Sequence, residues 1–111
     1  MKYMDLAVKI ARGSDPSNKH FLLGCVGKRS DGALVVSTNI RTQHPMPSAH
    51  SEARNLKKCG FGATLWVARI DRLGNICLAK PCEWCQALCK NKRVKRIHYT
   101  ISATEYGVMD F

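Results

Sequence analysis

The chain has 111 residues, of which 45% are hydrophobic, and its 18 Lys and Arg against 8 Asp and Glu give a formal net charge of +10. This length predicts a single domain over residues 1–111, because most domains contain about 50 to 250 residues. No apolar run approaches the roughly 20 residues of a membrane helix, and the N-terminus lacks the apolar block of a signal peptide. We therefore expect a cytoplasmic protein without membrane contact, whose positive charge either attracts nucleotides or nucleic acid or only keeps the surface soluble.

The first third of the chain predicts a helix followed by a hairpin. Apolar residues at helical spacing indicate an amphipathic helix over the first dozen residues, which ends at the breaker residues 13–18. Two apolar runs, 21–27 and 33–38, flank an Asp-Gly pair at Asp31-Gly32. That pair is typical of a tight turn between two antiparallel strands.

Helices and strands alternate in the rest of the chain. In chain order we expect a helix over 50–58, a strand over 63–70, a helix over 82–91 and a strand over 96–101. Such alternation predicts an α/β fold with a mixed central sheet that starts with an antiparallel hairpin, gains a parallel pair late in the chain and carries helices on both faces. After residue 101 the sequence leaves hardly any room for another strand.

Two short motifs carry the candidate chemistry. Cys82 and Cys85 form a Cys-x-x-Cys directly after a proline, and His50-Ser51-Glu52 precedes Cys82 by 32 positions. If both motifs open helices, their side chains converge beyond the helix ends, because side chains lean toward the N-terminus of a helix. One imidazole and two thiolates then describe an open zinc site that keeps a position for water. Glu52, which is not a ligand, is the natural proton carrier beside that water.

The combined pattern, His-x-Glu and then Pro-Cys-x-x-Cys, resembles the zinc-dependent cytidine and deoxycytidylate deaminase superfamily, over about residues 22–101. The resemblance implies the three-layer cytidine deaminase-like fold, with zinc held by His50, Cys82 and Cys85. It also implies hydrolytic conversion of cytosine to uracil, by attack of zinc hydroxide at C4 while Glu52 shuttles the protons. The implied partners are a nucleoside, a nucleotide or a single-stranded nucleic acid, and further copies of the chain in a homo-oligomer.

The resemblance also indicates residues that touch the substrate. Asn39, just after the second predicted strand, and Ala49, next to the metal ligand His50, are the implied contacts to base or sugar. Trp84 either stacks on the base or is a packed aromatic. Gly24 and Cys25 stand where the family keeps small residues beneath the ring.

Other interpretations remain open at this point. One is an adenosine deaminase that acts on a tRNA-like loop. Another is a basic nucleic-acid-binding module with structural zinc, in which Cys89, one turn beyond Cys85, could serve as a fourth ligand. The basic cluster between Lys90 and Arg96 is either a solvated face or an attractor of phosphates.

Overall fold

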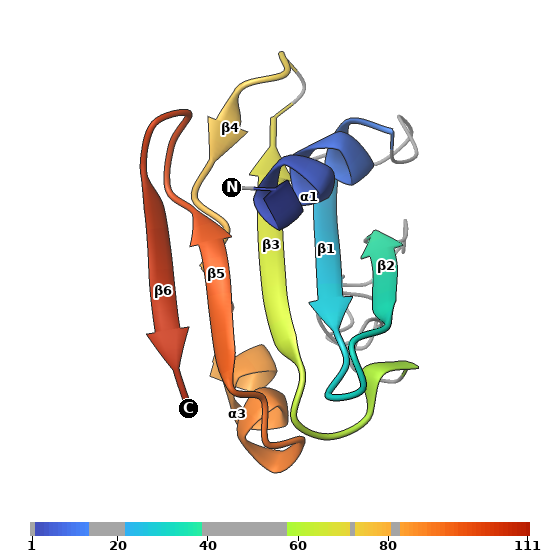
Figure 1. Cartoon of the computed structure of the whole chain (residues 1–111). Helices are drawn as coiled ribbons and strands as arrows, with labels where there is room; N and C mark the ends of the chain where they lie inside the picture. The colour runs from blue at the N-terminus through green and yellow to red at the C-terminus, as the bar shows by residue number, and fades with distance from the viewer. Residues whose placement is uncertain (1, 14–21, 39–57, 72, 81–82) are drawn as a thin grey trace, which may run out of the picture.

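A computed structural model describes residues 2–13, 22–38, 58–71, 73–80 and 83–111 of the chain (Figure 1). Its elements are, in chain order, α1 (Lys2–Arg12), β1 (Leu22–Lys28), β2 (Leu34–Thr38), β3 (Thr64–Ile70), β4 (Ile76–Cys77), α3 (Glu83–Asn91), β5 (Arg96–Thr100) and β6 (Tyr106–Asp110). No helix within these ranges is long and apolar enough to cross a bilayer.

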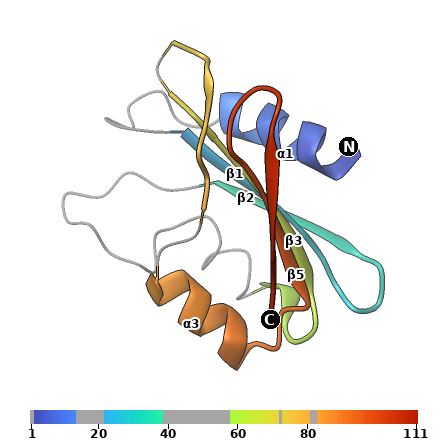
Figure 2. The ribbon, with the colours of Figure 1, turned by 90° about the vertical axis from the view of Figure 1, so that its left-hand side faces the viewer.

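The strands form one mixed sheet in the order β2-β1-β3-β5-β6, with β4 paired to β3 beside this path. β1 pairs antiparallel with β2 and β3, β3 pairs parallel with β5, and β5 pairs antiparallel with β6. α1 covers one face of the sheet and α3 lies on the other (Figure 2). The predicted mixed α/β fold with an antiparallel start, a late parallel pair and helices on both faces is confirmed.

β3 lies at the centre of the sheet and is buried on both faces. Leu65 and Val67 belong to the core on the α3 side, together with Cys89 of α3. Trp66 and Ala68 belong to the core on the α1 side. Because successive side chains of a strand point to opposite faces, this double burial explains why the strand is apolar from Leu65 to Ala68.

The first hairpin closes as the Asp-Gly pair predicts. The N–H of Arg29 donates to the carbonyl of Ala33 (2.8 Å) and the N–H of Gly32 donates to the carbonyl of Arg29 (2.9 Å). Gly32 has φ +92°, which glycine adopts without a steric penalty. The loop is therefore the three-residue type, a turn followed by one left-handed residue.

The C-terminal segment corrects one expectation, because the chain does form another strand after residue 101. β6 pairs with β5 in a register that places Gly107 opposite Tyr99. A Cβ on Gly107 would lie only 2.3 Å from Cζ of Tyr99, so the missing side chain makes room for the tyrosine ring. From the sequence we expect no strand around Gly107, whereas in the structure this glycine lets β6 pack beside Tyr99.

Three rings pack together on the α1 face of the sheet, of which Trp66 and His98 are stacked and Tyr3 is tilted against Trp66. The Tyr3 and Trp66 centroids are 4.6 Å apart, and Trp66 and His98 are 5.2 Å apart with their planes within 5°. Nδ1 of His98 is buried and has no hydrogen-bond partner among the described residues. Burial lowers the pKa of His98 below its ordinary value; the charge of Arg96 acts in the same direction and that of Asp110 opposes it. The folded state therefore prefers the neutral imidazole.

We expect acid to destabilise the fold through His98. Because the pKa of His98 is lower in the folded state than the ordinary value of about 6.5, the unfolded chain binds this proton more readily. The contribution to stability is complete above about pH 6.5 and is lost as the pH falls toward the folded-state pKa. Urea unfolding at several pH values should show a steeper loss for the wild type than for His98→Phe, which keeps a stacking ring but does not titrate. Equal losses would contradict this role of His98.

Candidate metal centre

Cys85 is the predicted metal ligand that lies within the described residues. It stands in the first turn of α3, which begins at Glu83, and its side chain is fully buried. The other predicted site residues lie outside the described residues: Asn39, Ala49, His50, Glu52 and Cys82. The side chain of Trp84 is likewise not described, so these assignments stay predictions.

The two described cysteines of α3 have different surroundings. Cys89 belongs to the apolar core on the α3 side, with Leu65, Val94 and Ile97. Cys85 is just as buried but belongs to neither described core cluster. The packing of Cys89 is that of a core residue, because a buried thiol behaves as a small hydrophobe. This arrangement favours Cys85 over Cys89 as the metal ligand of α3.

The position of Cys85 fits a zinc thiolate. The first turn of a helix presents the positive end of the helix dipole, which stabilises a thiolate there. Burial also keeps competing water away from the sulfur. Within the described ranges no three His, Cys, Asp or Glu side chains cluster as a metal site. That result is the one expected, because the other predicted ligands lie outside those ranges.

Hydrogen bonds from β3 and β5 hold the segment that leads into the Pro-Cys-x-x-Cys motif. The hydroxyl of the fully buried Thr100 donates to the carbonyl of Cys77 (2.8 Å) and accepts from the N–H of Arg69 (3.3 Å). The N–H of Ala79 donates to the carbonyl of Thr100 (2.8 Å), and Nη1 of Arg69 donates to that of Leu78 (3.4 Å). The chain is thus fixed two residues before Pro81. The sequence gives no signal for this role of Thr100, which depends on the position of β4.

Gly24 packs against α1, which explains its small size without a substrate. A Cβ on Gly24 would lie 2.2 Å from the carbonyl oxygen of Ala7 and 2.6 Å from the nitrogen of Ala11. Cys25, the next residue, belongs to the core on the other face, with Val67. The packing of α1 therefore accounts for this glycine, and the expected contact of Gly24 and Cys25 with a substrate ring stays a prediction.

The chain adopts the fold of the cytidine deaminases. The structure is similar to the cytidine deaminase from Mycobacterium leprae, with a TM-score of 0.65 and 19% identity over 98% of this chain and 90% of that one. It is also similar to the cytidine deaminase from Mycobacterium tuberculosis, with a TM-score of 0.56 and 19% identity over 89% of this chain and 81% of that one. At these identities the likeness shows the fold. A comparison with curated proteins finds no match.

The family itself is shown by the sequence. Residues 1–101 match the cytidine and deoxycytidylate deaminase zinc-binding region. The chain belongs to this family of zinc-dependent deaminases, and zinc is the metal of the family.

Proposed function

We propose that the chain converts cytosine to uracil in a free nucleoside or nucleotide, by zinc-dependent hydrolysis. The observation that carries the proposal is the buried Cys85 in the first turn of α3, within the family's zinc-binding region. His50, Cys82 and Cys85 would hold the metal. When bound, zinc supplies a hydroxide nucleophile near neutral pH by lowering the pKa of water from about 15.7 to about 7.

The residues of the chain would move the protons and hold the base. Glu52 takes one proton from the attacking water and passes it to the ring nitrogen next to C4. It then takes the second proton from the new hydroxyl group on C4 and delivers it to the leaving amine. One water is consumed and one ammonia is released, so the exchange needs no oxidant or reductant. Asn39 and Ala49 would orient the base or its sugar, because an amide donates and accepts hydrogen bonds at once. Trp84 would line the mouth of the site.

The likeness in fold to a cytidine deaminase supports a small substrate. The chain covers 90% of the Mycobacterium leprae protein, which is described as a cytidine deaminase. The sheet also has a strand after residue 101, β6, which the sequence does not predict.

We also propose that the chain forms a homo-oligomer in the cytoplasm. Apolar side chains on both outer strands support self-association: Leu34 and Val36 of β2 and Val108 of β6 are 46%, 48% and 51% exposed. Exposed apolar surface of this kind is common where copies of a chain meet.

A substrate panel tests the proposal. Zinc-loaded protein is incubated with cytidine, deoxycytidine, their monophosphates, adenosine, single strands that contain one cytosine and a stem-loop that contains one adenosine. We expect ammonia release with a mass gain of about one dalton in a free cytosine compound. Conversion confined to the single strands, or to the stem-loop adenosine, would contradict the proposed substrate. A zinc-loaded protein that converts none of them would contradict the enzymatic function.

A further inference from the structure

Basic residues gather at one end of the sheet. We name this surface the basic end; around Phe61 it comprises Arg29, Lys58, Lys90, Lys92, Arg93 and Lys95. At this end β1 turns into β2, β3 begins, and α3 leads into β5 (Figure 1). The residues therefore come from segments far apart in the sequence.

Contacts hold these segments side by side. The N–H of Gly62 donates to the carbonyl of Lys92 (3.2 Å), and the N–H of Lys95 donates to that of Ala63 (2.9 Å). Nζ of Lys92 lies 5.4 Å from the centre of the Phe61 ring. The first hairpin adjoins them, because a Cβ on Gly62 would lie 3.8 Å from Cβ of Ser30. The cations are thus arranged on one connected surface.

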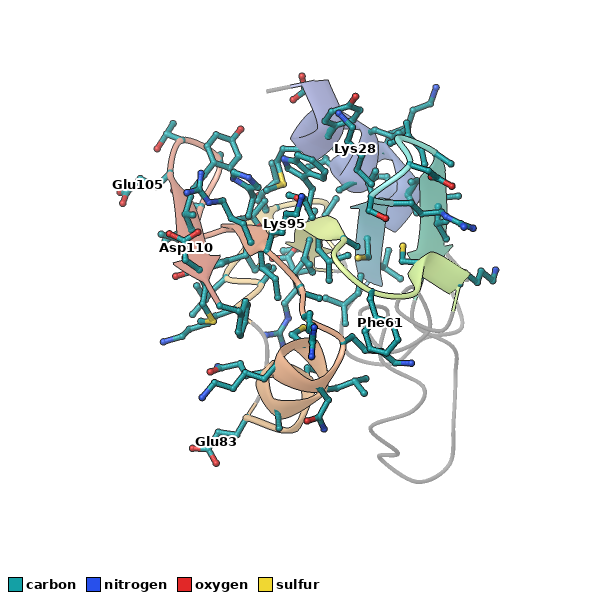
Figure 3. The ribbon with its side chains drawn as sticks, turned by 60° about the horizontal axis from the view of Figure 1, so that its bottom comes forward. Lys28, Phe61, Glu83, Lys95, Glu105 and Asp110 are labelled. Carbon is teal, nitrogen blue, oxygen red and sulfur yellow. The ribbon has the colours of Figure 1, made fainter. Side chains whose placement is uncertain are left out.

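Few carboxylates neutralise this surface. Asp31 pairs with Arg29 at 3.4 Å. Among the described residues no ion pair involves Lys58, Lys90, Arg93 or Lys95. Figure 3 shows the labelled acids Glu83, Glu105 and Asp110 on the side away from Phe61. The basic end therefore carries a strong positive field, which attracts anions.

Phe61 gives the basic end a second property. Its side chain is 62% exposed, whereas Cys59 and Ala63, two residues before and after it, are buried in the core. An exposed aromatic ring among cations matches the surfaces that bind single-stranded nucleic acid, where bases stack on the ring and phosphates meet the cations.

Arg93 adds an independent observation. It has φ +54°, just after the end of α3. The N–H of Val94 donates to the carbonyl of Cys89 (3.0 Å) and the N–H of Arg93 donates to that of Lys90 (3.1 Å). This is a helix ending that usually has glycine at the left-handed position, because other residues are strained there. The chain keeps an exposed arginine where glycine would be more stable, and strain of this kind is common at functional sites.

We propose that the basic end binds single-stranded nucleic acid at a surface separate from the metal centre. α3 separates the two, since Cys85 stands in its first turn and Lys90 in its last, with Arg93 beyond. A rise of about 1.5 Å per residue places these positions roughly 8 to 12 Å apart along the helix. The binding goes beyond deamination of a small substrate and does not depend on it.

Fluorescence anisotropy with labelled oligothymidylate of about 20 nucleotides tests the proposal, because this strand has no cytosine to deaminate. We expect binding that weakens with salt. Lys92→Gln/Lys95→Gln should weaken it and lower the slope of log K against log salt by about 1.4, since each phosphate contact to a single strand contributes about 0.7. Phe61→Leu should weaken binding about fivefold or more and leave the slope unchanged. Lys9→Gln/Arg12→Gln on α1 is the charge-matched control and should bind as tightly as the wild type.

Arg93→Gly separates binding from stability. We expect the variant to melt about 3 °C higher, because glycine relieves the left-handed strain, and yet to bind the strand more weakly. Three results would overturn the proposal: equal loss of affinity in the α1 control, displacement of the strand by saturating cytidine, or equal affinity for an abasic strand of the same length. The last result would identify a surface for any polyanion. Cytidine turnover is measured in parallel, so a protein without deaminase activity can still pass or fail this test.

Discussion

Glu52→Gln should abolish most of the deaminase activity while the protein keeps its zinc. Proton transfer by a positioned carboxylate contributes about 10² to 10⁴ in rate, and an amide of the same size cannot accept or deliver the proton. Glu52 is not a predicted ligand, so metal content should stay at one zinc per chain and the melting temperature should stay close to that of the wild type. Cytidine turnover, metal analysis and thermal melting of the same preparation measure the three quantities.

Two cysteine variants complete this experiment. Cys85→Ala removes a thiolate ligand, so the protein should lose zinc as well as activity. Cys89→Ala removes the same thiol group from the apolar core. This variant should keep its zinc and its activity, and its free energy of unfolding should fall by about 1 kcal/mol. A Glu52→Gln protein that retains full function, or a Cys89→Ala protein that loses zinc, would instead indicate a structural metal site.

The elements of the fold were predictable because their patterns are local. The spacing of Tyr3, Leu6, Ala7, Ile10 and Ala11 predicts the helix, although its most buried face is centred on Met4, Ala7, Val8 and Ala11. The mainly apolar run over 63–70 predicts a strand, which the structure confirms as β3. Such patterns follow from helix and strand geometry alone, so they need no knowledge of what lies opposite.

The features that the sequence did not predict depend on contacts between distant segments. Gly107 makes room for Tyr99 only once β6 pairs with β5, and Thr100 holds Cys77 only once β4 pairs with β3. In the candidate site the sequence places Cys89 one helical turn deeper than Cys85, and the structure adds that Cys89 packs in the apolar core.

Gly24→Ala should strongly destabilise the fold, because it adds a methyl group where β1 packs against α1. The new Cβ would approach the Ala7 carbonyl oxygen to 2.2 Å and the Ala11 nitrogen to 2.6 Å, and both obstacles are backbone atoms that no rotamer change can move. α1 would have to lift from β1 and open the core that it forms with Val26 and Trp66. We expect a loss of about 3 kcal/mol, at the upper end of the usual cost of overpacking, and a fall in Tm of about 12 °C.

Gly13→Ala is the matched control for this effect. It adds the same methyl at the end of the same helix, where the nearest atoms, the carbonyl oxygens of Lys9 and Ile10, would lie at an ordinary 3.6 and 3.8 Å. Its stability should therefore stay within about 0.5 kcal/mol of the wild type. Because both variants lose one glycine, the gain from a less flexible unfolded chain is similar in each and cancels in the comparison. If Gly24→Ala melted as high as Gly13→Ala, α1 could not lie against β1 at the distance that the structure describes.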